Sequence, residues 1–400
     1  MRVTRVDMFY DLADTTWGPE EVDAINRVVV EGRFTMGESV RQFEHAFAAH
    51  FGLKHAVMVN SGSSANLVAV AALFYKKDRP LRRHDEVIVP AISWATTFHP
   101  LQQYGLKLRF VDVEPDTLNM DVSQLESALT PRTRMVVAVS ILGNPAALDV
   151  IRAFCDRHGL YLFEDNCESM GASLGGRQCG TFGDVNTFST FFSHHISTME
   201  GGVVLTDDDE IARLVRIIRN HGWDRPEPGA LDTQSAEGFF EAYRFVMPGY
   251  NVRPLEICGA VGIEQLKKLD AMVDRRRANA RLFGELFSDD TRFTLQREHG
   301  RSSWFSFTIV LNPGIDRLRV MRDLRAAGIG FRMITGGCFP RHEAIKYFEY
   351  DMVNSLPNAN HAHDHGFFVG NHPKDLTAEI TRLREVLDRA TAPVPSAVAR

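Results

Sequence analysis

The stretch that most constrains this chain is a polar loop between two apolar segments. It runs from Ser189 to Gly202, and Val203-Val204-Leu205 follows it. Apolar and β-branched flanks of this kind are typical of buried strands, and a polar loop between buried strands is a common place for chemistry. Two adjacent histidines, His194 and His195, stand inside the loop. We therefore expect a functional site to be built around it.

Segments with the character of strands and helices alternate through the N-terminal part of the chain. Strand-like apolar segments lie at residues 55–60, 86–90, 106–113, 135–142 and 160–165. Helical spacing of apolar residues appears at residues 19–32, 37–52 and 67–73. With the two strands that flank the loop, this pattern predicts an α/β fold with a mostly parallel sheet of about seven strands, covered by helices on both faces.

The C-terminal part follows a different pattern, with a long helix and then a few separate strands and helices. Its expected helices lie at 254–286, 318–326 and 376–390, and its expected strands at 304–311 and 328–334. We predict two domains: an N-terminal arm with a large domain over residues 1–255, and a linking helix with a smaller α+β domain over 256–400. The polar stretch 226–238 is expected to be an exposed loop, and the tail after Thr391 to be frayed.

Composition excludes several classes of function. A formal net charge of −6 and an isoelectric point near 6.2 give no general attraction to nucleic acid or to an anionic membrane. No apolar run approaches the roughly 20 residues of a membrane span, and the N-terminus has no apolar signal-peptide core, so we expect a cytoplasmic protein. The five cysteines are scattered, without a Cys-x-x-Cys pair. No zinc or iron–sulfur site is therefore expected.

A turn of small residues follows the first predicted strand. Ser61-Gly62-Ser63-Ser64 joins that strand to an apolar helix. Gly62 permits a close backbone approach, and the free N–H groups of a helix start attract phosphate. The same residues fit an ordinary helix cap equally well.

An aromatic residue and two acids follow other strands. Trp94 comes after the strand at 86–90 and offers a large face for stacking on a ring, with a core tryptophan as the alternative. Asp165 ends the strand at 160–165, and Glu168 stands three residues on. A carboxylate there suits the protonated ring nitrogen of a cofactor, with a helix cap as the alternative.

Together these segments resemble the sugar-aminotransferase family of pyridoxal phosphate (PLP) enzymes of fold type I, and within it the nucleotide-sugar 3-dehydratases. The resemblance covers nearly the whole chain and is carried by the runs Phe34–Gly37, Val57–Asn66 and Glu164–Gly171. In the family the loop reads Ser-Phe-His-x-x-Lys, six residues ahead of Glu-Gly-Gly. Counting back six residues from Glu200 places His194 where the family has its cofactor-binding lysine.

The resemblance implies an aspartate-aminotransferase-like fold, a homodimer and a set of residue roles. Cofactor contacts are implied for the phosphate by Gly62, Ser63 and Ser189, for the ring by Trp94 and Asp165, and for the 3-hydroxyl by Glu168. Asn251, in the turn Gly249-Tyr250-Asn251-Val252-Arg253, is implied to reach the partner subunit's cofactor. Arg225 and Arg332 are expected to meet anionic groups of the substrate, although Arg332 also fits a solvated arginine.

Because a histidine stands at the lysine position, the expected chemistry differs from that of a lysine-dependent PLP enzyme. An amine condenses with the aldehyde of PLP, whereas an imidazole only moves protons near neutral pH. The resemblance therefore implies non-covalent PLP, used as pyridoxamine phosphate (PMP), with His194 as the base. The implied reaction removes the C3 hydroxyl of a nucleotide-linked 4-keto-6-deoxyhexose, with GDP-4-keto-6-deoxy-D-mannose as the expected substrate. L-Glutamate is the expected amino donor, and the products are a 4-keto-3,6-dideoxysugar, ammonia and 2-oxoglutarate.

Two other functions stay open at this point. One is a nucleotide-sugar aminotransferase that uses another lysine, although no lysine stands in a matching loop. The other is a non-catalytic PLP-binding regulator, although no DNA-binding module is apparent. The iron–sulfur members of the family carry cluster cysteines where this chain has none, between Arg219 and Asn251. The sequence leaves open which nucleotide and which hexose are bound.

Overall fold

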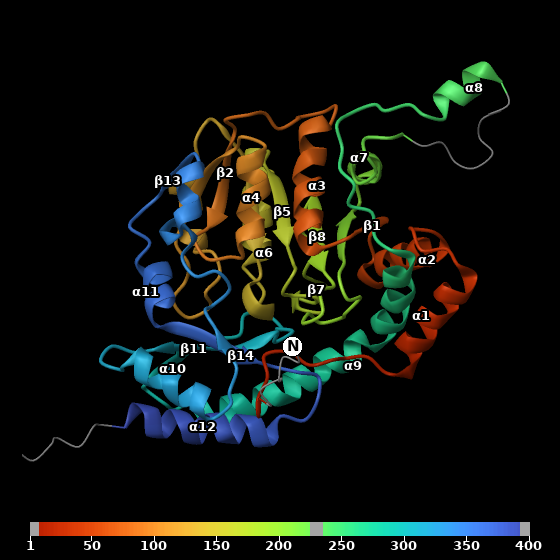
Figure 1. Ribbon diagram of the computed structural model, residues 1–400. Coiled ribbons are helices and arrows are strands. Elements are labelled where there is room, and N and C mark those ends of the chain that lie inside the picture. The colour runs from red at the N-terminus through yellow and green to blue at the C-terminus, as the bar shows by residue number, and fades with distance from the viewer. Residues whose placement is uncertain (1–7, 225–234, 393–400) are drawn as a thin grey trace, which may run out of the picture.

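The computed structural model describes residues 8–224 and 235–392, and two β-sheets organise them (Figure 1). The larger sheet has eight strands in the order β1-β9-β8-β5-β4-β2-β3-β13. They are β1 (His55–Val59), β2 (Glu86–Pro90), β3 (Lys107–Val111), β4 (Thr133–Val139), β5 (Tyr161–Asp165), β8 (Val185–Ser189), β9 (Gly202–Thr206) and β13 (Tyr350–Met352). The smaller, antiparallel sheet consists of β10 (Phe293–Leu295), β11 (Ser306–Leu311), β14 (Gly366–Gly370) and β12 (Phe331–Arg332). A short hairpin pairs β6 (Ser173–Leu174) with β7 (Arg177–Gln178).

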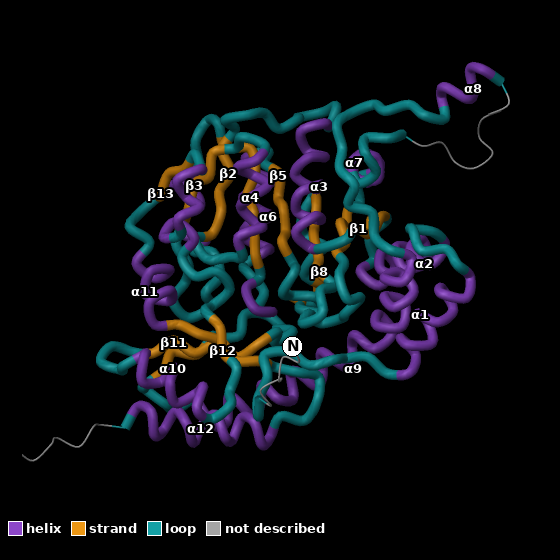
Figure 2. Tube along the Cα trace, in the orientation of Figure 1, coloured by secondary structure: helices purple, strands orange, loops and turns teal. Residues whose placement is uncertain are grey.

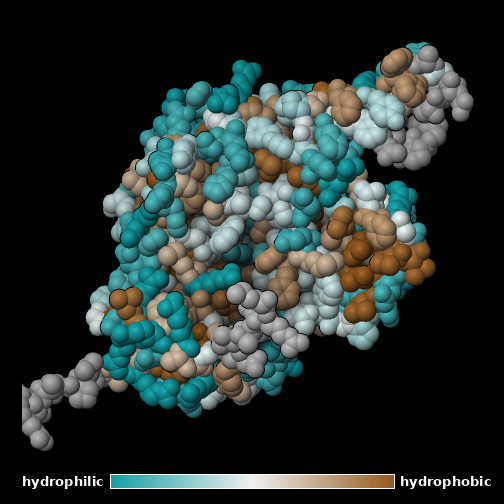
Figure 3. Space-filling model, viewed as in Figure 1, coloured by the Kyte–Doolittle hydropathy of each residue, from teal (hydrophilic) through white to brown (hydrophobic). Residues whose placement is uncertain are grey.

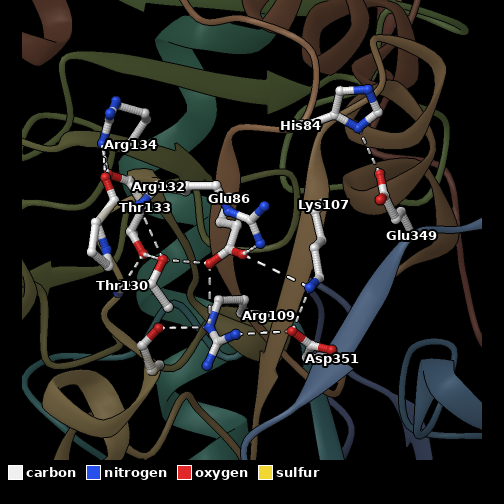
Figure 4. A network of polar contacts seen from close by, with 12 residues as sticks. His84, Glu86, Lys107, Arg109, Thr130, Arg132, Thr133, Arg134, Glu349 and Asp351 are labelled. Carbon is white, nitrogen blue, oxygen red and sulfur yellow. Dashed lines mark hydrogen bonds and ion pairs between the residues drawn. The ribbon is translucent and has the colours of Figure 1, made fainter.

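The larger sheet is mostly parallel, as the sequence predicts. The strands from β8 to β13 are parallel neighbours, whereas β9 and β1 at one edge pair antiparallel. The predicted count of seven is wrong by one, because β13 joins the opposite edge from the C-terminal part. This strand has three residues in a polar setting, so no hydrophobic alternation indicates it. Ion pairs of Asp351 with Lys107 (2.6 Å) and Arg109 (3.0 Å) hold it against β3 (Figure 4).

Helices cover both faces of the larger sheet (Figure 2). Along β2, Val87 and Val89 belong to one apolar core with residues of the helices at 62–75, 95–103 and 209–218, whereas Ile88 belongs to another with residues of the helix at 148–158. The helices of the N-terminal part are α1 (Pro19–Glu31), α2 (Glu38–Phe51), α3 (Gly62–Tyr75), α4 (Ala95–Gln103), α5 (Leu125–Ala128), α6 (Leu148–His158) and α7 (Asp209–Ile218). Helix α3 begins five residues before the predicted start, because Ser61 caps it.

Helix α9 (Glu256–Phe287) connects the two sheets. Its first half packs with α2 beside the larger sheet, and its last turns pack in the core of the smaller one. The remaining helices are α8 (Ala236–Glu241), α10 (Arg317–Ala326), α11 (Pro357–His365) and α12 (Thr377–Thr391). The domain division at residue 255 stays a prediction. Residues of α11 pack in a core of the larger sheet, and Tyr10 packs in that of the smaller one.

Some predictions fall outside the described residues. Arg225, most of the expected loop 226–238 and the tail from residue 393 lie there. Within the described ranges, no helix has both the length and the apolar character needed to cross a membrane.

Candidate active site

The predicted cofactor residues of the larger domain, apart from Asn251, lie at the edge of the large sheet where its parallel strands end. β5 ends at Asp165 and β8 at Ser189, while α3 starts just after β1. Open α/β sheets bind ligands at this edge. The elements converge at Gly62, where a Cβ would lie 2.6 Å from Cβ of Ser189 and 3.0 Å from Sγ of Cys167. Only glycine permits so close an approach.

The turn at Gly62 is a helix cap, and it also suits an anion. Oγ of Ser61 accepts a hydrogen bond from the Ser64 amide (3.0 Å), which is the cap that the sequence allowed. The first N–H groups of a helix have no partner within it and carry its positive dipole end. Ser63 is exposed and donates to Oγ1 of Thr96 (3.0 Å), which places it beside the segment of Trp94. The two alternatives are therefore compatible.

Asp165 is held as a buried, oriented carboxylate. Its Oδ2 accepts hydrogen bonds from Nδ2 of Asn66 (2.9 Å) and Oγ1 of Thr97 (2.7 Å), and its Oδ1 accepts from the Cys167 amide (3.1 Å). These three donors hold the carboxylate in one orientation. No helix follows Asp165, so the alternative of a helix cap is wrong. The geometry suits a carboxylate that faces a protonated ring nitrogen.

Glu168 lies in a different environment from Asp165. Its Oε2 accepts a hydrogen bond from the Leu142 amide (3.0 Å). Burial, helped by the nearby charge of Asp165, raises the pKa of Glu168 to about 7. Glu168 therefore exchanges a proton near neutral pH.

His194 presents a defined nitrogen to the site. Its Nδ1 lies 2.6 Å from the Cys167 carbonyl. Because a carbonyl only accepts, Nδ1 carries the proton, and Nε2 of the neutral ring has the free lone pair. Burial lowers the pKa of His194 to about 4, against the opposing effect of the Cys167 carbonyl. The ring is therefore neutral and basic at Nε2 near pH 7.

His195 points into the protein interior. It is fully buried, and its Nε2 donates to the Ser303 carbonyl (3.4 Å). Burial lowers the pKa of His195 well below the ordinary value. The two histidines thus differ in role: His194 bonds the loop that carries Asp165 and Glu168, whereas His195 bonds the smaller domain.

Trp94 and Ser189 complete the cluster in different ways. Trp94 is 54% exposed at the start of α4, so the alternative of a core tryptophan is wrong. Ser189 is buried, and its Oγ accepts a hydrogen bond from the Phe191 amide (3.3 Å). This contact shapes the start of the histidine loop.

Asn251 and Arg332 stand apart from this cluster. Asn251 is exposed and accepts a hydrogen bond from Nε of Arg253 (3.1 Å). Arg332 is exposed on β12 of the smaller sheet. Among the described residues, no hydrogen bond or ion pair joins either side chain to His194 or Asp165. Their roles, like that of Arg225, stay predictions.

Several residues of the site had no role assigned from the sequence. Asn66 and Thr97 fix Asp165, and Phe305 packs edge-on against the His194 ring with centroids 5.1 Å apart. Asn66 is a polar residue in an apolar helix, which was a usable signal. Phe305 gave none, because it is more than a hundred residues away from the loop.

The buried neutral histidines predict a pH dependence of stability. An unfolded histidine binds a proton below about pH 6.5, whereas His194 and His195 stay neutral in the fold. The unfolded state therefore binds more protons between about pH 6.5 and 4, and the free energy of unfolding falls as the pH is lowered. Urea unfolding at several pH values measures this slope. His195→Asn is expected to make the slope shallower, and an unchanged slope would contradict the assignment.

The chain is similar in sequence and in structure to several known proteins. A family model, the DegT/DnrJ/EryC1/StrS aminotransferase family, matches residues 16–388. A GDP-4-keto-6-deoxy-D-mannose 3-dehydratase of Yersinia pseudotuberculosis is 48% identical over 386 residues, which are 95% of this chain and 98% of that protein. The structure of an Escherichia coli GDP-4-keto-6-deoxy-D-mannose-3-dehydratase with bound hydrated PLP matches with a TM-score of 0.91 and 46% identity, covering 95% of this chain and 99% of that one. A GDP-4-keto-6-deoxymannose-3-dehydratase with a trapped PLP-glutamate geminal diamine matches with a TM-score of 0.90 and 46% identity, covering 94% and 100%.

Proposed function

The chain belongs to the DegT/DnrJ/EryC1/StrS aminotransferase family, and from this we propose that it is a lyase of that family, a PLP/PMP-dependent nucleotide-sugar 3-dehydratase. The observation that carries the proposal is His194 at the family's lysine position, with Nδ1 tied to the Cys167 carbonyl and Nε2 free as a base. Identity of 48% to a named 3-dehydratase over most of both chains favours this function over transamination.

The reaction is the removal of the C3 hydroxyl from GDP-4-keto-6-deoxy-D-mannose, with L-glutamate as amino donor. The products are the 4-keto-3,6-dideoxysugar, ammonia and 2-oxoglutarate. The oxygen lost from C3 balances the oxidation of glutamate to 2-oxoglutarate and ammonia. The reaction therefore needs neither an outside electron donor nor an iron–sulfur cluster.

The residues at the sheet edge fit the cofactor. Asp165, with three donors on its carboxylate, would face the ring nitrogen, and the exposed Trp94 would stack on the ring. The start of α3 at Gly62 and Ser63, with Ser189 beside it, would hold the phosphate. When bound, the cofactor supplies an electron sink for a carbanion next to its ring.

The protein's own groups then divide the proton transfers. Nε2 of His194 takes a proton, since its ring is neutral and its other nitrogen is engaged. The Asp165 carboxylate would accept a hydrogen bond from the protonated ring nitrogen of the cofactor. Glu168, with its pKa raised to about 7 by burial, would share a proton with the cofactor's 3-hydroxyl.

Transamination through another lysine has little support from the lysine positions. The chain has eight lysines. Five are tied in ion pairs: Lys76 to Asp208, Lys107 to Asp351, Lys267 to Glu264, Lys268 to Glu20 and Lys374 to Asp14. An amine held by a carboxylate is protonated and is a poor nucleophile.

A turnover assay tests the function. Purified protein is loaded with PLP and given GDP-4-keto-6-deoxy-D-mannose and L-glutamate, without iron, reductase or electron donor. Mass spectrometry should show a sugar with one oxygen fewer, together with ammonia and 2-oxoglutarate. A product that carries a new amine, with no ammonia released, would establish an aminotransferase instead. The CDP- and dTDP-linked ketosugars serve as controls for the nucleotide.

We also propose that the protein is a cytoplasmic homodimer. The segment that includes α8 extends from the body (Figure 1) and exposes Phe239, Phe240, Tyr243 and Phe245, with Phe240 74% exposed. Apolar side chains also gather over α1 (Figure 3), where Val22, Val29 and Val30 are exposed. Exposed apolar patches of this kind mark interaction sites. Asn251 in its exposed turn is then available to the partner's cofactor.

Light scattering measures the oligomeric state. The chain has a mass of 45.0 kDa, and we expect a particle of twice that mass. Replacing Phe240 by Ser should weaken the dimer, whereas Leu318→Ser, which changes an exposed leucine of the smaller domain, should not. A monomer that retains full turnover would contradict the dimer and the role of Asn251.

A further inference from the structure

A short segment of the smaller domain reaches the histidine loop. Residues 302–305 precede β11 and lie against the turn after β4. There the Ser303 amide donates a hydrogen bond to the Gly143 carbonyl (2.9 Å), and the Phe305 amide donates one to the Leu142 carbonyl (3.0 Å). On its other side the Phe305 ring contacts the rings of both His194 and His195, with centroids 5.1 and 5.5 Å away. This segment therefore contributes to the positions of both imidazoles.

Arg276 of α9 holds the 302–305 segment in place. The side chain is 3% exposed, and its Nη1 donates to the carbonyls of Phe305 (3.2 Å) and Asn371. Nδ2 of Asn371 donates in return to the carbonyls of Arg276 (3.1 Å) and Trp304 (2.8 Å). Three segments that are distant in sequence are thus tied at one point behind His194.

The charge of Arg276 is unusual because no carboxylate among the described residues forms an ion pair with it. Its Nε is buried without a hydrogen-bond partner in that same set. Buried charges are normally paired, since burial disfavours the charged form. Burial lowers the pKa of Arg276 to about 10, which still leaves it charged near pH 7. Its field therefore acts on its neighbours.

The charge of Arg276 affects the pKa values of the neighbouring histidines. The lowered pKa of His194 is caused mainly by burial, and Arg276 adds to the lowering. The Cys167 carbonyl and Asp165 act in the opposite direction. The pKa of His195 is lowered first by burial, then by Arg276 and His194, and more weakly by Arg277. Glu168 and the Cys167 thiol are titratable groups of the segment that bonds His194, and the pKa of His372 is lowered by burial and, to a smaller extent, by Arg276.

We propose that Arg276 is a positioning residue for His194: it fixes the segment whose Phe305 ring seats the imidazole, and its unpaired charge favours the neutral ring that the reaction needs. The proposal rests on the function proposed above, in which His194 is the base. It assigns a role in the reaction to a residue of α9 that lies behind the site rather than in it.

The test is the titration of the His194 imidazole in PMP-loaded protein, followed by NMR and assigned by loss of its signal in His194→Gln. Arg276→Met removes the charge with little change in length. The midpoint is expected to move up by about one pH unit, a roughly tenfold gain in proton affinity. The acid limb of the kcat profile should move up with it. Arg276→Lys keeps the charge and should leave the midpoint near that of the native protein.

Arg277→Met is the matched control. Arg277 also holds this region, by donating to the carbonyls of Ser302 (2.9 Å) and Gly171 (2.9 Å), but it is paired with Asp274. Its loss should leave the midpoint unchanged. Should Arg276→Met fail to fold, Arg276→Gln, which retains an amide donor, replaces it.

The possible outcomes separate this proposal from the function. An unchanged midpoint in the neutral Arg276 variant, or an equal shift in Arg277→Met, would overturn the proposed charge effect. A shifted midpoint in a protein that dehydrates no ketosugar would overturn the function and leave the effect of Arg276 on His194 standing.

Discussion

Replacing His194 by Asn is expected to lower turnover by about 10²–10⁴-fold, the usual contribution of a general acid–base group, while PMP still binds. The amide retains some hydrogen bonding but has no nitrogen that titrates. Asp165, Trp94 and the start of α3, which are proposed to hold the cofactor, are unchanged. Turnover and the exchange of the C4′ proton of the cofactor into deuterated water measure the loss.

His195→Asn is the matched control for this variant. His195 is buried and bonds the Ser303 carbonyl, so its loss should lower stability more than turnover. Equilibrium unfolding measures this decrease in the free energy of unfolding. Near-normal dehydration by His194→Asn together with none by His195→Asn would show that the required histidine is His195, so that the assignment along the loop is wrong by one residue. If neither change slowed proton exchange, the base would have to be another group.

Replacing His194 by Lys is expected to create a covalent link to PLP that the native protein lacks. The amine would lie beside the cofactor's aldehyde, with which an imidazole cannot condense. Borohydride reduction followed by intact-mass measurement should therefore give a pyridoxyl adduct in the variant and none in the native protein. Dehydration should fall in the variant, because an amine engaged with the cofactor is not a free base throughout the cycle.

Borohydride reduction of the native protein tests whether any native lysine bonds the cofactor. A stoichiometric adduct on native protein would mean that one of the eight lysines bonds the cofactor, and peptide mapping would identify it. That result would favour the aminotransferase. Absence of an adduct in the His194→Lys variant would place residue 194 away from the aldehyde.

Much of the fold was predictable because its signals are local. Apolar segments indicated the strands β1, β2, β3, β4 and β5, and helical spacing indicated α1 and α2. Position 194 could be assigned by counting along the loop from Glu200. Asp165 was predicted for the same reason, since a strand end is a local feature that brings its side chain to the ligand edge of an α/β sheet.

The sequence by itself therefore determined the class of fold, the position of the histidine that is proposed as the base, and the absence of a lysine there. The tertiary structure decided what local patterns do not encode. The Cys167 carbonyl selects which nitrogen of His194 is free, and the Leu142 amide, from the turn after β4, is the hydrogen-bond partner of Glu168. Arg276 and Phe305 reach the histidines only because α9 and the smaller domain pack behind the loop. Such contacts join residues far apart in the chain, and they depend on packing and on the exclusion of water, neither of which leaves a periodic trace in the sequence.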